Sequence, residues 1–168
     1  MSEVLMVPLA KIEDHGLDQT RTAHAITDAI CRLADQGHMK HVPTEQVIND
    51  VGWVALAGQD IVGYIRVKSE AVFIEPEKHG STRWQEVGSL WVPDPWKGQK
   101  ISEKLIASAT AFLLPKHIQP FAICRNAQST RAFRQEGYIP GLAPDDRPCL
   151  TRPLVQITAK SYDMMLTA

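Results

Sequence analysis

One strand-to-helix turn in this sequence has the composition of a phosphate-binding site. Residues 86–92 form an apolar, strand-like run, and the Pro-Asp-Pro segment at 93–95 ends it. Residues 97–102, Lys-Gly-Gln-Lys-Ile-Ser, then lead directly into a helical pattern. The first turn of a helix presents free backbone N–H groups at the positive end of the helix dipole, an arrangement that binds diphosphates. We therefore expect an anion site here, to which Lys97 and Lys100 add positive charge.

A second polar segment opens another helical pattern further along the chain. The apolar run at residues 120–124 predicts a strand, and Asn126 follows it where a helix would begin. Residues 126–133 are Asn-Ala-Gln-Ser-Thr-Arg-Ala-Phe, and Gly137 and Tyr138 come shortly after them. Across both segments, the order of strand, turn, helix, strand and helix indicates a nucleotide pocket.

Both segments resemble coenzyme-binding sequences of the GCN5-related N-acetyltransferases, a family that binds acetyl-CoA and acylates amines. The loop pattern of this family is Gln/Arg-x-x-Gly-x-Gly/Ala, and residues 97–102 align with it, with lysine, lysine and serine at its three defined positions. Residues 126–133 with Gly137 and Tyr138 align with the second segment of the family, Asn-x-x-Ser/Ala-x-x-Leu-Tyr followed by Gly-Phe. The chain is thus similar to the family in two segments at the expected separation.

The resemblance implies an α/β (α+β) fold, the acyl-CoA N-acyltransferase fold, with a single mixed, mostly antiparallel sheet flanked by helices. In that fold the fourth and fifth strands splay apart and hold the pantetheine arm of acetyl-CoA, the cosubstrate, between them. The length of the chain and its 44% hydrophobic content suit one sizeable core. We expect residues 1–168 to form a single acetyltransferase-like domain.

Hydrophobic periodicity predicts the elements that must position these segments. Residues 69–83 predict an extended strand and then a polar loop that lies over the acceptor pocket. Helices are expected at residues 20–36, from residue 43, from residue 102 up to Pro115 and from residue 126. The other expected strands are 4–9, 53–57, 61–67, 86–92, 120–124 and a last one near 154–157.

The resemblance also implies which residues contact acetyl-CoA. Backbone N–H groups of residues 90–92 would polarise the thioester carbonyl, and Arg131 is preferred over Arg125 and Arg134 as the contact to the 3′-phosphate. Asn126 would bind the pantetheine arm or the adenosine side, although an Asn at a helix start is also an ordinary N-cap. The implied coenzyme-binding residues are Leu90, Trp91, Val92, Lys97, Gly98, Gln99, Lys100, Ile101, Ser102, Asn126, Ser129, Arg131 and Phe133.

Two residues of the predicted phosphate turn have alternative interpretations. Lys100 stands where the family has a glycine, and its ammonium group either contacts the diphosphate or is simply exposed to solvent. Ser102 either lends its hydroxyl group to the ligand or acts only as the N-cap of the helix.

Acetyl transfer requires a neutral amine nucleophile, so a protonated amine must first lose a proton. Glu86 lies at the strand position where many members of the family keep a glutamate that takes this proton, commonly through water. The alternative is a solvated carboxylate at a strand edge. The usual acid of the family is a tyrosine, but Phe133 occupies its position and has no proton to give. Tyr138 and Tyr64 are expected to be packing residues, so the leaving thiolate would take its proton from solvent.

The composition of the chain argues against several other classes of protein. The 18 basic and 19 acidic side chains nearly cancel, which is not the charge balance of a nucleic-acid binder. No apolar run approaches the roughly 20 residues that span a bilayer, so we expect no membrane partner and a cytoplasmic location. Cys31, Cys124 and Cys149 lack the spacing of a disulfide framework or zinc site, and His38 and His41 lack a third ligand, so no metal is expected.

These observations predict an N-acetyltransferase that moves an acetyl group from acetyl-CoA to a primary amine by direct attack. The acceptor would be a small-molecule or peptide amine, which the sequence does not identify. The alternative is a catalytically silent CoA-binding or protein-interaction module of the same fold, which Phe133 and the irregular loop favour. A homodimer is compatible with the resemblance but no residue establishes it.

Overall fold

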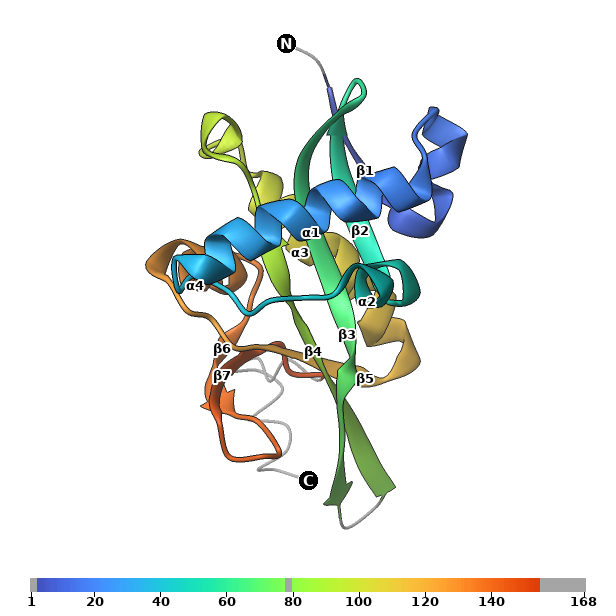
Figure 1. Ribbon diagram of the computed structural model, residues 1–168. Coiled ribbons are helices and arrows are strands. Elements are labelled where there is room, and N and C mark those ends of the chain that lie inside the picture. The colour runs from blue at the N-terminus through green and yellow to red at the C-terminus, as the bar shows by residue number, and fades with distance from the viewer. Residues whose placement is uncertain (1–2, 78–79, 155–168) are drawn as a thin grey trace.

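The computed structural model describes residues 3–77 and 80–154, and a single sheet forms its centre (Figure 1). The described residues form a 7-stranded sheet in the order β1-β2-β3-β4-β5-β7-β6. Neighbouring strands are antiparallel except for β4 and β5, which are parallel. This mixed, mostly antiparallel sheet confirms the predicted fold class. Its strands are β1 (Val4–Pro8), β2 (Val51–Ala57), β3 (Asp60–Glu77), β4 (Gly80–Trp91), β5 (Ile118–Ala122), β6 (Ile139–Leu142) and β7 (Pro148–Thr151).

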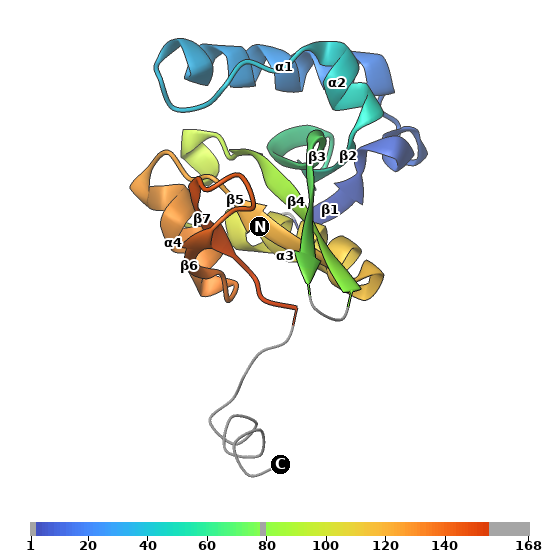
Figure 2. The same ribbon diagram turned by 90° about the horizontal axis from the view of Figure 1, so that it is seen from below.

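Helices cover both faces of the sheet, with α1 and α2 on one face and α3 on the other (Figure 2). None of the helices in the described ranges is long and apolar enough to cross a membrane. The α-helices are α1 (Gln19–Asp35), α2 (Thr44–Asn49), α3 (Ile101–Leu113) and α4 (Ala127–Gln135). The 3-10 helices are η1 (Leu9–His15), η2 (Asp94–Trp96) and η3 (Leu114–Lys116).

The central strands contribute to a hydrophobic core on each face of the sheet. Successive side chains of a strand point to opposite faces, so β2 serves both cores. Ala55 is buried in the cluster that contains Leu105 of α3. Its neighbour Val54 is buried in the other cluster, with Ile26 of α1. The apolar runs of the middle strands therefore hold α1 and α3 on opposite sides of the same sheet.

Helix α1 begins and ends close to the predicted boundaries. The side chain of Asp18 accepts a hydrogen bond from the backbone N–H of Arg21 at 2.8 Å, which makes Asp18 the N-cap. Gly37 follows the helix with φ of +81°, a left-handed conformation that glycine adopts without a steric cost. The segment after this glycine leads to α2 and runs past the carboxyl-terminal part of β4.

Strands β4 and β5 separate within the sheet, as the predicted fold requires. Their parallel pairing runs from Arg83 opposite Ile118 to Glu86 opposite Phe121. Beyond Glu86, β4 continues to Trp91 while β5 turns away toward α4. The two strands therefore separate after Glu86, toward the C-terminal end of β4, where the predicted site residues lie.

One expectation about the strands is wrong. Residues 69–83 do not end in a polar loop over the pocket, because β3 continues without a break to Glu77 and pairs with β4 from Val72 opposite Gln85 to Glu77 opposite Gly80. Pairing of residues 72–77 with residues 80–85 extends this hairpin instead. The last described strand is β7, in which Thr151 pairs with both β5 and β6, and the strand expected near residues 154–157 stays a prediction. Residues 155–157 lie outside the described part of the chain.

Candidate functional site

The predicted phosphate turn has the backbone conformation that an anion site needs. Gly98 has φ of +84° and Lys100 has φ of +62°, so the chain is left-handed twice before α3 begins. Lys100 is the N-cap, and among the described residues no side chain accepts a hydrogen bond from the first turn of α3. Ser102 is therefore not the N-cap, which corrects that alternative. The backbone N–H groups of this first turn remain available to an external acceptor.

Lys97 is held by a local ion pair at the same turn. Its Nζ atom lies 2.6 Å from Oδ1 of Asp94, three residues earlier, and both side chains are exposed. The hydrogen bond and charge of Lys97 lower the pKa of the Asp94 carboxyl group. Part of the positive charge predicted for this turn is thus already paired.

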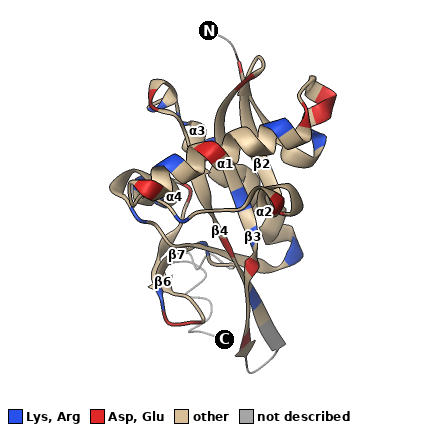
Figure 3. Cartoon of the chain, viewed as in Figure 1, with Lys and Arg blue, Asp and Glu red and all other residues tan. Residues whose placement is uncertain are grey.

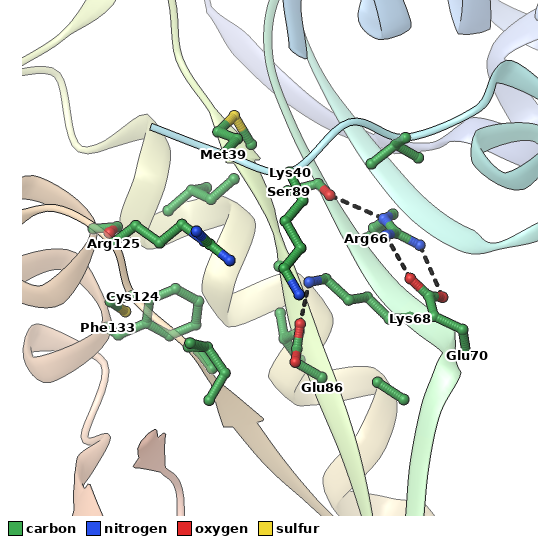
Figure 4. Close-up of a pocket in the computed structure, with 18 of the residues that line it drawn as sticks. Met39, Lys40, Arg66, Lys68, Glu70, Glu86, Ser89, Cys124, Arg125 and Phe133 are labelled. Carbon is green, nitrogen blue, oxygen red and sulfur yellow. Dashed lines mark hydrogen bonds and ion pairs between the residues drawn. The ribbon is translucent and has the colours of Figure 1, made fainter. Parts of the chain in front are cut away.

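The opening between β4 and β5 leads into a pocket of about 350 Å³. Its wall comes from β3, β4, the segment between α1 and α2, and the segment between β5 and α4 (Figure 4). Ser89 has φ of +54° on the wall, next to shifts in the β3–β4 register, so β4 is bulged there. Glu86, Leu90, Asn126, Ser129 and Phe133 are the predicted site residues that the pocket brings together.

The other predicted coenzyme contacts lie outside this pocket lining. Trp91 packs against the cluster under α1 and α2, whereas Val92 packs against the cluster under α3. Residues 97–102 form the turn and the start of α3. Arg131 is exposed on α4, and Asn126 caps that helix by accepting a hydrogen bond from the N–H of Ser129 at 2.8 Å. The capping interpretation of Asn126 is therefore confirmed.

Glu86 is buried at the floor of the pocket, with 4% of its surface exposed. Its Oε2 atom forms an ion pair with Nζ of Lys68, which reaches it from β3 (Figure 4). Its Oε1 atom lies 3.4 Å from Nη2 of Arg147. Glu86 is thus not the solvated strand-edge carboxylate of the alternative interpretation. Because the contact of Oε1 is long, that oxygen can accept a further hydrogen bond from water or substrate.

Arg66 is the centre of a buried ion-pair network beside Glu86. Its guanidinium group is 3% exposed and forms hydrogen bonds to Oδ2 of Asp50 and to Oγ of Ser89, the latter at 2.9 Å. It also binds both carboxylate oxygens of Glu70, at 2.7 and 3.1 Å. Oδ1 of Asp50 accepts a hydrogen bond from Ser69 at 2.6 Å. The network anchors the bulged residue Ser89 and satisfies the charges of both acids.

Two more cations extend into the pocket without an ion pair. Lys40 comes from the segment between α1 and α2, and Arg125 comes from the segment between β5 and α4 (Figures 1 and 4). Neither forms a salt bridge with another described residue. Figure 3 places basic residues on the elements around the pocket.

Among the described residues that line the pocket there is no tyrosine, the usual acid of the family that the sequence resembles. Phe133 is buried, and its ring packs edge-on against Tyr138 with centroids 4.9 Å apart. The Tyr138 hydroxyl shares a hydrogen bond with Thr110 at 2.7 Å, and burial raises its pKa, which confirms its packing role. Burial also raises the pKa of the Cys124 thiol, so it remains protonated near neutrality.

Sequence reasoning missed Arg66, Lys68, Ser89 and Arg147. Arg66 and Lys68 are two residues apart in an apolar strand, so they lie on one face, and such charges in a buried run were a usable signal. The bulge at Ser89 had no signal, because serine has no preference for positive φ. Arg147 reaches Glu86 from 61 positions away, which only the fold can bring about.

No protein-family model matches the sequence, and no curated protein matches it significantly. Solved structures do resemble the fold. An acetyltransferase of the GNAT family from Staphylococcus aureus superposes with a TM-score of 0.65 at 11% identity, covering 91% of this chain and 100% of that chain. N-acetylglutamate synthase from Neisseria gonorrhoeae, complexed with coenzyme A and N-acetyl-glutamate, superposes with a TM-score of 0.64 at 16% identity, covering 93% of this chain and 36% of that chain. NAA60 from Arabidopsis thaliana, in complex with a bisubstrate analogue, superposes with a TM-score of 0.52 at 12% identity, covering 89% of this chain and 95% of that chain.

Proposed function

We propose that this chain, which has the fold of the GCN5-related N-acetyltransferases, transfers an acetyl group from acetyl-CoA to a primary amine. The observation that carries the proposal is the opening between β4 and β5 beyond Glu86, which lies between an uncapped helix start and a charged pocket. The N-acetylglutamate synthase of the same fold is complexed with coenzyme A, which supports the same cosubstrate here.

In this proposal, acetyl-CoA binds along the start of α3 and between the separated strands. The N–H groups of the first turn, near Gly98 and Lys100, would bind the diphosphate. Backbone N–H groups of residues 90–92 would polarise the thioester carbonyl, and the bulge at Ser89 would redirect the backbone toward it. The amine nitrogen would attack the thioester carbon directly, the new C–N bond would form as the C–S bond breaks, and the CoA thiolate would leave and take a proton from solvent.

Glu86 is the proposed proton acceptor for the amine, directly or through a water molecule. Its Oε1 atom faces the pocket with room for one more hydrogen bond. Lys68 and Arg147 fix the position of the carboxylate. Unpaired cations nearby also disfavour a protonated amine, because like charges repel. The basic wall of the pocket thus helps to supply the neutral nucleophile that the reaction needs.

The second candidate is a silent CoA-binding or protein-interaction module. Two observations favour it: both oxygens of Glu86 already face cations, and Phe133 removes the usual acid. Calorimetry with CoA and acetyl-CoA, followed by a product assay, separates the candidates. Binding with acetylated product from a panel of amino acids, amino sugars, polyamines and peptides supports the enzyme. Binding without any product supports the silent module, and absence of binding contradicts both coenzyme-dependent roles.

A further inference from the structure

We infer that the acceptor is a small primary amine that also carries an anionic group, a carboxylate or a phosphate. This inference rests on the proposed acetyl transfer and names the class of its substrate. It starts from Lys40 and Arg125, which line the pocket and have no ion pair within the described ranges. Lys40 and Arg125 are therefore distinct from Lys68 and Arg147, the cations that hold Glu86.

The two cations reach the pocket from opposite walls. In Figure 4 the ammonium group of Lys40 extends toward Glu86 and Lys68, while the guanidinium group of Arg125 points into the pocket from the side of Cys124 and Phe133. They lie 85 positions apart in the sequence, and their two segments both line this pocket. A cation pair with a shared open space between its members is a suitable place for an anion, because one anion offsets the repulsion of both.

The acids at the pocket are already paired, which argues against a polycationic acceptor. Both oxygens of Glu70 accept hydrogen bonds from Arg66, and Asp50 lies buried behind the same guanidinium group. Glu86 contacts both Lys68 and Arg147. A diamine or polyamine that entered would meet Lys40 and Arg125 without an unpaired carboxylate to bind. We therefore expect the pocket to prefer an acceptor that carries an additional negative charge.

The size of the pocket fits a small acceptor. A volume of about 350 Å³ lies at the lower end of the range for small-molecule sites, which is roughly 300–1,000 Å³. This space must hold the acetyl end of acetyl-CoA as well as the acceptor, with the acceptor amine beside Glu86 and the anionic group between Lys40 and Arg125. A free amino acid or an amino-sugar phosphate has both groups within that reach.

Matched acceptor pairs test the inference on the full-length protein. Alanine against alaninamide and glucosamine 6-phosphate against glucosamine each differ in one anionic group, and 1,4-diaminobutane represents a cationic acceptor. We expect kcat/KM to be about 10- to 100-fold higher for the anionic member of at least one pair, the effect of one hydrogen-bonded charge. The pair that responds distinguishes carboxylate from phosphate recognition.

Substitutions then assign the effect to the two cations. Lys40→Gln and Arg125→Gln should each raise KM for the anionic acceptor by about tenfold, with little change in the KM for acetyl-CoA. Both residues are exposed, so these variants should fold, and Lys11→Gln, on the exposed side of η1, is the matched control. Arg125→Glu should reduce the preference for the anionic member further.

The outcomes separate this inference from the proposed function. Acetylated product with no preference in either pair, or with a preference for 1,4-diaminobutane, overturns the anionic acceptor but leaves the acetyltransferase in place. A rise in KM for acetyl-CoA rather than for the acceptor in Arg125→Gln assigns that arginine to the coenzyme and also overturns the inference. No product from any acceptor overturns the proposed function together with it.

Discussion

The carboxylate of Glu86 and the ammonium group of Lys68 form an ion pair across β3 and β4 at the point where β4 leaves β5. Their side chains are 5% and 17% exposed, so the pair is shielded from most of the solvent. It places a fixed carboxylate at the junction of the opening between β4 and β5 and the pocket.

Replacement of Glu86 by glutamine should reduce kcat at neutral pH by about 100-fold or more, the usual contribution of a general base. The amide is close in shape to the carboxylate but cannot accept a proton from the amine. The affinity for acetyl-CoA, measured by calorimetry, should change little, because Glu86 is not among the proposed coenzyme contacts. An unchanged kcat would remove Glu86 from the role of base.

Lys100→Gly and Lys100→Ala form a matched pair at the start of α3. Both remove the ammonium group, but only glycine adopts φ of +62° without strain. The glycine variant should therefore be more stable to urea than the alanine variant by about 1 kcal/mol. If the ammonium group contacts the diphosphate, both variants should bind CoA more weakly than the original chain at low salt and similarly at high salt. Equal stability of the two variants would contradict the left-handed conformation.

Arg66→Met should lower the free energy of unfolding by about 3–5 kcal/mol, the cost of breaking a buried ion pair. The reason is Asp50, whose side chain is fully buried and would lose its cationic partner. Urea denaturation monitored by fluorescence measures the change. The double variant with Asp50→Leu should recover a large part of the loss, because the uncompensated charge is then removed. A single variant as stable as the original chain would show that the network carries little stability.

The pH dependence of stability should include a contribution from Glu70. Burial alone would raise the pKa of this carboxyl group, but the hydrogen bonds from Arg66 outweigh burial and lower the pKa below the ordinary value of 4.5. A lowered pKa in the folded state means that the unfolded chain binds the proton more readily. The stabilisation is therefore complete above pH 4.5 and is lost as the pH falls through the lower, folded-state pKa.

Urea denaturation of Glu70→Gln across pH 3 to 7 checks this dependence. The stability difference between the original chain and the variant should be constant near neutrality and shrink on acidification below 4.5. Asp18→Asn, an exposed N-cap outside the network, is the control, because asparagine caps a helix as well as aspartate does. A difference that grows toward low pH has the wrong sign for this explanation.

The fold and one part of the site could be predicted from the sequence because their signals are local. Asp18, Gly37 and Asn126 mark helix ends by their own chemistry, and α1 and α4 begin close to the residues predicted for them. The turn before α3 was likewise visible in residues 97–102. Local capping and turn preferences act within a few residues, so a single sequence contains them.

The charge pattern of the pocket could not be predicted in the same way. Lys40, Arg125 and Arg147 lie in segments without a regular pattern, and their approach to Glu86 depends on the complete sheet. The length of β3 was missed for a related reason: Val72 and Ile74 are exposed, so its outer half lacks a buried stripe to mark it. Pairing with β4, rather than burial, holds that half in the extended conformation.

The positions of Lys40 and Arg125 have an evolutionary consequence. Both side chains emanate from connecting segments and contribute little to either hydrophobic cluster. Under the proposed function, point changes there can alter which acceptor binds without threatening the integrity of the scaffold. Descendants of this chain could thus exchange one acceptor for another in few steps while the buried network around Arg66 is inherited intact.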